Sequence, residues 1–219
     1  MTAVRRLPPR LRAGLLLSAV VLLATLVGPE VWPHDPLDPD YGATYAGPSL
    51  QHPLGTDGLG RDVLARTLAG GRVSLVIAVG AALATLLLGG AAGLLASDAG
   101  RRVDAVLVRL FDALLAFPGF LLVLLVVAGL GGGTLQTLGA LAVAGAPTYF
   151  RLVRGFARSL RSADHVAAAR ALGATRWRTT VHHVTPLLAG PVLVQLATTM
   201  VTFLLVEASL SYLGVGVSL

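Results

Sequence analysis

The sequence contains no cysteine and no lysine, and each absence excludes a class of chemistry. Without cysteine there are no disulfide bridges and no thiolate metal sites. All 17 basic residues are arginine. The chain therefore has neither the lysine with which a P-loop holds nucleotide phosphates nor the amine that a Schiff-base enzyme needs.

Charged residues are also scarce, and apolar residues take their place. Only 13% of the 219 residues are charged, 55% are hydrophobic, and the mean hydropathy is +0.78. Soluble proteins are about half apolar and about a quarter charged, so this composition predicts an integral membrane protein. The net charge of +6 fits arginines that flank membrane spans, and we expect no nucleic-acid partner.

The apolar runs predict an all-α fold, a polytopic transmembrane helical bundle with five spans. Residues 1–12 form an arginine-rich tail, 13–28 the first span, 29–71 a loop rich in proline and aspartate that ends in an interfacial helix from Val63, and 72–219 the membrane core. Within the core we expect spans at 73–96, 103–130, 134–147 and 187–213, with a kink at Phe117-Pro118-Gly119. Residues 13–28 also resemble a signal peptide, but no clear small-x-small cleavage site follows, which favours an uncleaved anchor.

The distribution of arginine predicts the orientation. With the N-terminus in the cytoplasm, 14 arginines lie on the inner side and three (Arg61, Arg66 and Arg72) on the outer side. Cytoplasmic loops of membrane proteins carry such an excess of positive charge. The polar segment 151–186, which holds seven of the arginines, is therefore expected in the cytoplasm.

Segment 151–186 is predicted to form an elbow of two short helices. Ser162 or Asp164 is expected to cap the first helix, and Gly173 to supply the left-handed residue after Leu172 that stops it. The second helix is expected from about Thr175 to Pro186, with Trp177, Val181 and Val184 on one face. The small side chains of the first helix would let another protein approach closely, and the surrounding arginines suit an acidic groove. The alternative is a loop that only holds anionic lipid headgroups.

The spacing of Ala167-Ala168-Ala169, Gly173 and Pro186 resembles the cytoplasmic signature of the permease subunits of bacterial binding-protein-dependent ABC importers, in the dipeptide, oligopeptide and nickel branch. Ala167 stands where that family has Glu, and Thr185 where it has Leu. Other runs that resemble this branch are His52 to Asp62, Arg109 to Pro118, Tyr149 to Arg154 and Glu207 to Gly214. The family has six spans, so we expect a sixth beyond residue 216.

The resemblance implies a multi-pass permease subunit of the bacterial inner membrane, in an ATP-driven importer of peptides or related small solutes. Nickel or another small solute is an alternative cargo. The implied partners are a homologous second permease subunit, cytoplasmic ATP-binding subunits that hydrolyse the ATP, an extracytoplasmic solute-binding protein and the lipid bilayer. The chain itself is expected to bind no cofactor and to catalyse no reaction. The contact with the ATPase is assigned to Ala167, Ala168, Ala169, Gly173, Arg176, Trp177 and Pro186.

Few other residues suggest chemistry. Glu207 lies in the last expected span, where a charge costs about 2.5 to 3.5 kcal/mol. It should therefore face the bundle interior or lie near the outer rim, and either line a pathway or serve the structure. Asp112 is expected to pair with Arg109 on one helix. Adjacent His182 and His183 cannot share a helix face, and His34 and His52 are far apart in sequence, so no metal site is expected.

Two functions of other classes remain as alternatives. An intramembrane enzyme could use Glu207 or the histidine pair, but the sequence lacks a convergent nucleophile, base and oxyanion donor. An ion-driven secondary transporter would be expected to show internal repeats and ionisable groups at the midplane. We find neither feature in the sequence.

Overall fold

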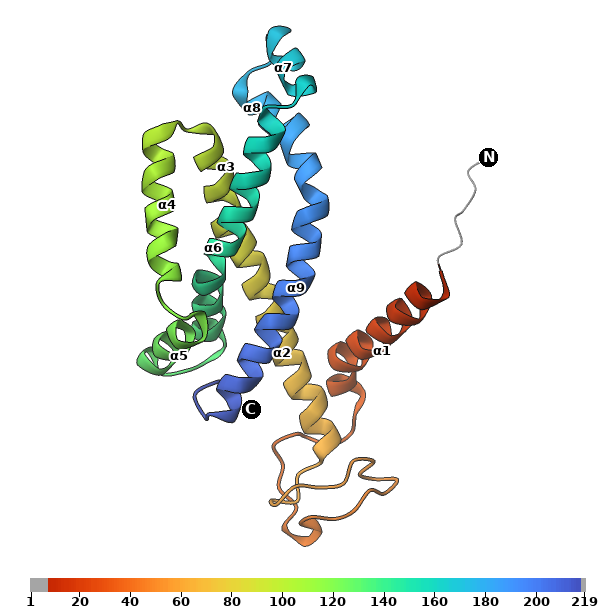
Figure 1. Ribbon diagram of the computed structural model, residues 1–219. Coiled ribbons are helices and arrows are strands. Elements are labelled where there is room, and N and C mark those ends of the chain that lie inside the picture. Colours follow the sequence, from red (N-terminus) through yellow and green to blue (C-terminus); the bar gives the residue numbers. More distant parts are fainter. Residues whose placement is uncertain (1–7, 218–219) are drawn as a thin grey trace, which may run out of the picture. The chain divides into compact units, whose positions relative to one another are not determined.

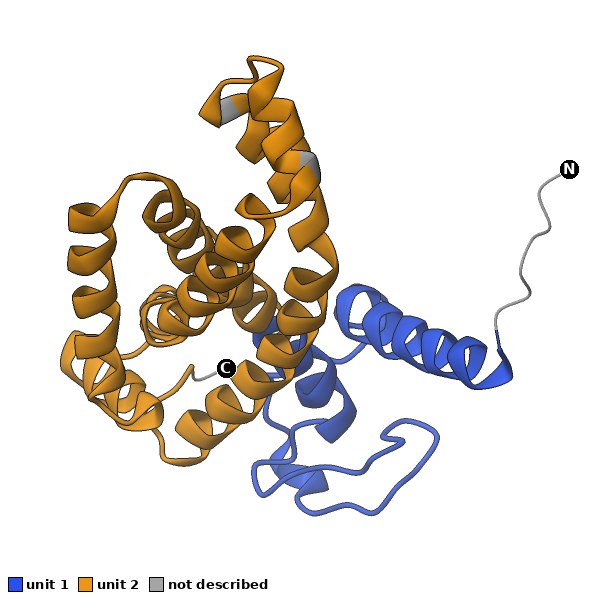
Figure 2. Cartoon of the chain, turned by 45° about the horizontal axis from the view of Figure 1, so that its top comes forward, with its two compact units in different colours: residues 1–74, 219 blue, residues 75–218 orange. Residues whose placement is uncertain are grey.

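The computed structural model describes residues 8–217, apart from the side chains of His165 and Trp177, and helices form nearly all of its regular structure (Figure 1). The prediction of an all-α membrane fold is confirmed for this part of the chain. Two compact units divide it, unit 1 up to Ser74 and unit 2 from Leu75 (Figure 2). Each unit is described by itself below.

Unit 1 contains α1 (Pro9–Val31) and a long loop that closes on Asp62. The indole nitrogen of Trp32 donates to Asp62 Oδ2 over 2.5 Å. The backbone amide of Ala65 donates to the same oxygen over 3.1 Å, so Asp62 caps the first turn of α2 (Val63–Thr85). The loop also contains the short 3-10 helix η1 (Tyr41–Ala43). One buried carboxylate thus ties both ends of the loop together.

The helix that begins at Val63 is not a separate interfacial element, as the sequence had suggested. α2 continues through a π-helical turn, η2 (Leu86–Gly90), into α3 (Ala91–Asp98), and together they form one apolar helix of 36 residues. Gly70 and Gly71 lie inside α2 without ending it. No proline follows them, so every backbone amide can stay in the helical hydrogen-bond pattern.

Within the described residues, three helices are long and apolar enough to cross a membrane, at Pro9–Val31, Val63–Asp98 and Thr180–Tyr212. A fourth span results if α4 (Arg101–Leu115) and α5 (Gly119–Leu130) count as one. These two helices meet at 80° across the Phe117-Pro118 break, which confirms the predicted kink and makes it a sharp bend. The last long helix is α9 (Thr185–Tyr212).

The remaining expected span corresponds to α6 (Thr134–Arg161), which runs 14 residues beyond the end expected at Pro147. Proline is tolerated inside membrane helices because neighbouring groups can satisfy the freed carbonyl. With 28 residues, α6 is about 42 Å long. It is less apolar than the other spans because its second half carries four arginines, and alanine, glycine and threonine take the place of leucine in its first half. Such small side chains suit a helix that packs against α3, α4, α5 and α9.

The closest contact of α6 is with the η2–α3 segment, at Gly89 and Gly93. A Cβ atom at Gly89 would lie 2.1 Å from the carbonyl oxygen of Ala146, and one at Gly93 would lie 2.9 Å from that of Phe150. Glycines four residues apart let two helix backbones approach each other in this way. Beside this contact, the rings of Phe111 and Phe150 stack at 4.3 Å and attach α4 to α6.

We predict that Gly89→Ala loosens this contact. The added methyl group meets backbone rather than a flexible side chain, so the two helices must separate at a cost of about 1 to 3 kcal/mol. Gly155→Ala is the matched control, because Gly155 lies in α6 with no atom within 4 Å of its Cβ position. Unfolding of both purified variants in mixed micelles measures the difference. Equal stability of the two would contradict the prediction.

We also predict that unit 1 loses stability in acid through Asp62. Burial raises the pKa of the Asp62 carboxyl, but hydrogen bonds from the Trp32 indole and the Ala65 amide outweigh burial and hold the pKa below its ordinary value. A lowered pKa stabilises the fold above the unfolded-state value of about 4. This contribution is lost as the pH falls through the lower folded-state value.

Fluorescence of Trp32 in a Trp177→Phe background, recorded between pH 7 and 2, follows this transition. Asp62→Asn should be less stable at pH 7 and should change less in acid. A profile identical to that of the parent chain would show that Asp62 does not carry the effect.

Candidate functional site

The predicted elbow is present at one end of unit 2, as α7 (Asp164–Ala171) and α8 (Arg176–Thr179) (Figure 1). Neither Ser162 nor Asp164 caps α7, so that prediction is wrong. Ala163 occupies the cap position without a side-chain bond, and the Ser162 hydroxyl donates backwards to the Ser159 carbonyl over 2.8 Å. Ser162 is instead the C-cap residue that follows α6, and Asp164 is already the first residue of α7.

Gly173 ends α7 as predicted. Its φ is +88°, a left-handed conformation that residues with a Cβ rarely adopt. The Gly173 amide donates to the Arg170 carbonyl over 2.9 Å, and the Ala174 amide donates to the Ala169 carbonyl over 3.0 Å. These two bonds satisfy carbonyls that a helix end would otherwise leave unpaired.

The second helix begins as predicted but does not end at Pro186. Thr175 Oγ1 accepts the Arg178 amide at the start of α8, over 3.3 Å. From there α8, the π-helical turn η3 (Thr180–Val184) and α9 follow without a break. Pro186 lies two residues beyond the end of η3, and such a π-helical adjustment lets a membrane helix accommodate the N–H that proline lacks. Val184 is buried and Val181 exposed, so these two do not share one buried face, and the side chain of Trp177 lies outside the described residues.

The exposed surface of the elbow combines small and apolar residues with the charged side chains of Asp164, Arg170, Arg176 and Arg178. Leu172, between α7 and α8, is 90% exposed, whereas Val166 and Thr179 are completely buried. The exposed residues also include Ala167, Ala168, Gly173, Arg176 and Pro186, and Ala169 is half-buried. Sequence reasoning missed Leu172, although a leucine directly before a helix-ending glycine is well placed to project.

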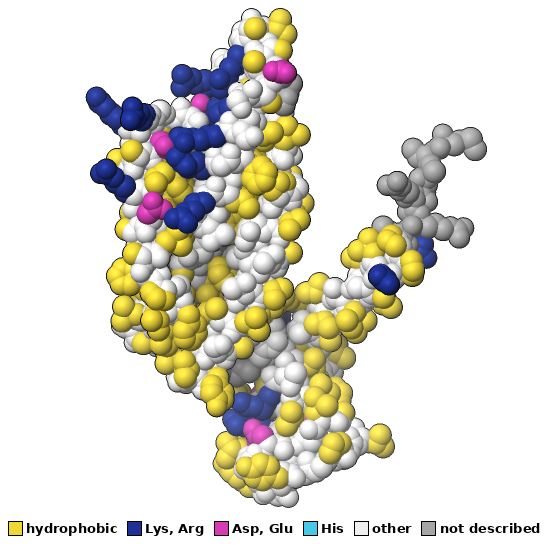
Figure 3. All heavy atoms as spheres, viewed as in Figure 1, with side chains coloured by type: hydrophobic (Ala, Val, Ile, Leu, Met, Phe, Trp, Pro, Cys, Tyr) yellow, Lys and Arg dark blue, Asp and Glu magenta, His cyan; other side chains and the backbone are white. Residues whose placement is uncertain are grey.

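The arginines near the elbow bind acids of the same chain more than they face outward. Figure 3 shows arginine side chains gathered at the elbow end of unit 2. Arg154 and Arg158 both contact the buried carboxylate of Asp104, at 2.5 and 2.7 Å. Arg161 contacts Asp98 at 2.9 Å. The acids that pair with these three arginines of α6 come from α3 and α4. Arg170, Arg176 and Arg178 of the elbow are exposed, so the suitability of the elbow for a partner's acidic groove stays a prediction.

Asp112 and Glu207 also have partners within the chain. Asp112 pairs with Arg151 of α6 at 2.7 Å, not with Arg109 as expected. Because α4 and α6 run side by side, the Arg151 guanidinium of α6 reaches the Asp112 carboxylate of α4. Glu207 is 5% exposed and accepts a hydrogen bond from Ser211 over 3.0 Å. Its place inside the bundle agrees with the expectation, while a role in a pathway stays a prediction.

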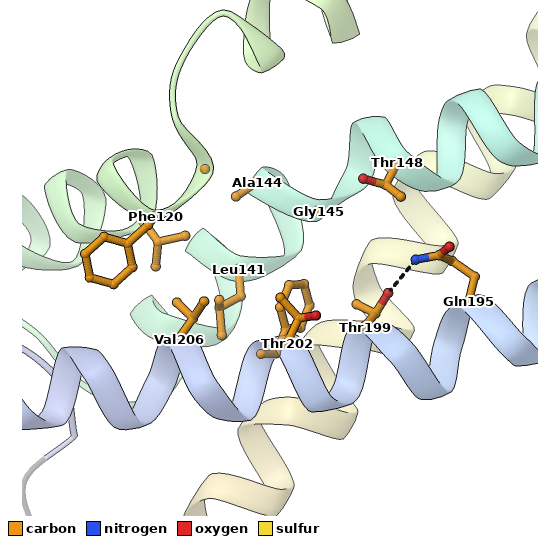
Figure 4. Close-up of a pocket in the computed structure, with 12 residues that line it drawn as sticks. Phe120, Leu141, Ala144, Gly145, Thr148, Gln195, Thr199, Thr202 and Val206 are labelled. Atoms are coloured by element: carbon orange, nitrogen blue, oxygen red, sulfur yellow. Dashed lines mark hydrogen bonds between the residues drawn. The ribbon is translucent and has the colours of Figure 1, made fainter.

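A pocket of about 250 Å³ lies between α5, α6 and α9 (Figure 4). Its walls are largely apolar, but four polar side chains line it, from Thr148, Gln195, Thr199 and Thr202. Gln195 Nε2 and the buried Tyr149 hydroxyl both donate to Thr199 Oγ1 over 3.3 Å. The sequence contained a sign of this polar wall, because Gln195, Thr199 and Thr202 recur at i, i+4 and i+7 within an apolar span and therefore lie on one helix face.

The loop of unit 1 brings together two histidines that are 18 residues apart. The rings of His34 and His52 lie 4.8 Å apart, and His52 Nδ1 lies 3.4 Å from Asp62 Oδ1. They line a polar pocket of about 330 Å³. Within residues 8–217, however, no group of three or more histidine and carboxylate side chains has the geometry to hold a metal ion.

Comparison with known proteins agrees with this architecture. Residues 89–219 match the family model described as binding-protein-dependent transport system inner membrane component. A provisionally named peptide transport system permease protein of Brucella suis biovar 1 is 38% identical over 94% of this chain and 69% of the relative. The dipeptide permease of Alkalihalophilus pseudofirmus and the oligopeptide permease of Bacillus subtilis are each 34% identical, over 93% of this chain and 67% of the relative.

Proposed function

The chain belongs to the family of binding-protein-dependent transport system inner membrane components, and we propose that it forms part of the pathway through which an ATP-driven importer moves peptides. Its relatives are named as permeases for peptide, dipeptide and oligopeptide transport, which supports this class of cargo. Nickel is the second candidate from the sequence. No observation in the described part of the chain favours it, since no group of histidine and carboxylate side chains there has the geometry to hold a metal ion.

The elbow is the proposed contact with a cytoplasmic ATPase subunit. The observation that carries this assignment is a tip with Leu172 fully projecting and small alanines behind it, on helices anchored by buried Val166 and Thr179. An exposed apolar side chain surrounded by small residues suits insertion into a groove of another protein. Because the chain has no lysine, the nucleotide-binding P-loop must come from that partner.

The pocket between α5, α6 and α9 is the proposed part of the pathway in this chain. A peptide carries amide donors and acceptors that need partners inside a membrane. The α9 wall offers the hydroxyl and amide groups of Gln195, Thr199 and Thr202, and the α6 wall offers the hydroxyl of Thr148. Because α9 continues from the elbow into this wall, movement of the elbow would reach the pocket along one helix.

The remaining assignments follow from this function. A homologous second permease subunit completes the pathway, and an extracytoplasmic solute-binding protein delivers the cargo. Closure of the ATPase subunits on ATP switches the spans between outward-facing and inward-facing states. The N-terminus and the elbow lie in the cytoplasm, as the arginine distribution indicates. The chain itself catalyses no reaction and binds no cofactor.

We predict that Leu172→Asp weakens binding of the ATPase subunits about 30-fold, the effect of losing an interface residue worth about 2 kcal/mol. Leu172→Met keeps an apolar side chain at the tip and serves as the control. Co-purification of the ATPase subunits and solute uptake by the reconstituted complex are the measurements. If Leu172→Asp binds and transports like the control, the elbow is not the docking surface.

We predict that Thr199→Val lowers peptide uptake about two- to tenfold, because it removes the hydroxyl that orders Gln195 and Tyr149. Thr198→Val is the matched control. Thr198 is the neighbouring residue on α9 and is exposed, and its hydroxyl donates to the carbonyl of Val194 one turn earlier. Both variants should retain their ATPase subunits. Equal uptake by the two would remove the pocket from the pathway.

A further inference from the structure

Asp98, the last residue of α3, lies where three separate elements meet. Its carboxylate Oδ1 is 2.9 Å from the Arg161 guanidinium at the end of α6. Its backbone carbonyl accepts a bond from Arg176 of α8 over 3.3 Å. The same Arg161 donates through its other terminal nitrogen to Thr180 Oγ1, at the start of η3, over 2.9 Å. One acidic residue thereby connects α3, α6 and the returning half of the elbow.

Burial makes this connection stiffer than the exposed ion pair between Arg151 and Asp112. The Arg161 side chain is only 10% exposed, so separating it from Asp98 would leave a charge in a poorly hydrated place. Arg170 and Arg176 lie close enough to repel Arg161, and Asp98 is the acid that offsets them. The Arg151–Asp112 pair is 61% and 49% exposed, and water can replace either partner at little cost.

We propose that Asp98 is a positioning residue that makes α3 move together with the elbow. The inference rests on the proposed docking of an ATPase at the elbow. A push on α7 and α8 reaches α9 through the continuous helix, but α3 belongs to a different span and has no covalent route to the elbow except through α4, α5 and α6. The hydrogen bonds from Asp98 through Arg161 to Thr180 supply a noncovalent route between α3 and the elbow. The η2–α3 segment is also in backbone contact with α6, at Gly89 and Gly93.

The main test compares Asp98→Asn with Asp112→Asn in the complete, reconstituted transporter. Each substitution removes the charge from one acid that pairs with an arginine of α6, but only the arginine that Asp98 binds, Arg161, also donates to η3 through Thr180. The two measurements are co-purification of the ATPase subunits and the number of ATP molecules hydrolysed per peptide imported. We expect both variants to retain the ATPase. Asp98→Asn should raise the ATP cost per peptide roughly three- to tenfold, while Asp112→Asn should match the parent chain.

The outcomes separate the two proposals. An unchanged ATP-to-peptide ratio in Asp98→Asn, or an equal rise in Asp112→Asn, overturns the role of Asp98 and leaves docking at the elbow intact. A parent chain that retains no ATPase overturns both. If Asp98→Asn does not fold, Thr180→Val serves as the test instead, because it removes one hydrogen bond to Arg161 and no charge. It should raise the ratio by a smaller factor, and an unchanged ratio then overturns the inference.

A structural measurement on the full-length chain distinguishes positioning from general stability. Because the chain has no cysteine, Ala99→Cys and Ala168→Cys place the only two spin labels, one beside Asp98 and one on the elbow. The label-to-label distance should be narrowly distributed in the parent chain and in Asp112→Asn. It should broaden in Asp98→Asn and narrow again in Asp98→Glu, which restores the carboxylate. Equal widths in all four chains would rule out the positioning role.

Discussion

The backbone contact between the η2–α3 segment and α6 is the constraint on which unit 2 depends. Helices in lipid gain little from burying apolar side chains against one another, so they associate through close packing. At Gly89 and Gly93 there is no side chain between the two backbones. The π-helical turn at Leu86–Gly90 inserts an extra residue there, a local irregularity often found at functional positions.

The consequences of this contact extend to both ends of α6. Toward the elbow, it keeps the acids of α3 and α4 within reach of the arginines at 151, 154, 158 and 161, which recur with helical spacing. Toward the other end, α5 and α9 complete the walls of the pocket. A change in the angle between α3 and α6 would therefore alter the ion pairs and the pocket together, since both use α6 as a wall.

A continuous helix leads from the elbow to the pocket. η3 and α9 run from Thr180 to Tyr212 as one apolar span, with the buried Thr180 at its start and the polar stripe of Gln195, Thr199 and Thr202 further along. The elbow itself contributes a rigid tip, because the bonds around Gly173 satisfy the end of α7. A rigid tip on a continuous helix is suited to carrying displacement over a distance, whereas a flexible arginine-rich loop would absorb it.

The sequence by itself determined the membrane class, the kink at Phe117-Pro118, the stop at Gly173 and the absence of a P-loop lysine. These features depend on composition, on a missing residue type or on local backbone chemistry, and none of them depends on which helices pack together. Only the tertiary structure decided which acids meet the arginines of α6, that Asp112 pairs with Arg151, and that Thr199 meets Tyr149 across 50 residues. Such pairings depend on which helix faces lie together, and that is set by the close approach at Gly89 and Gly93, which no periodicity within a single helix reveals.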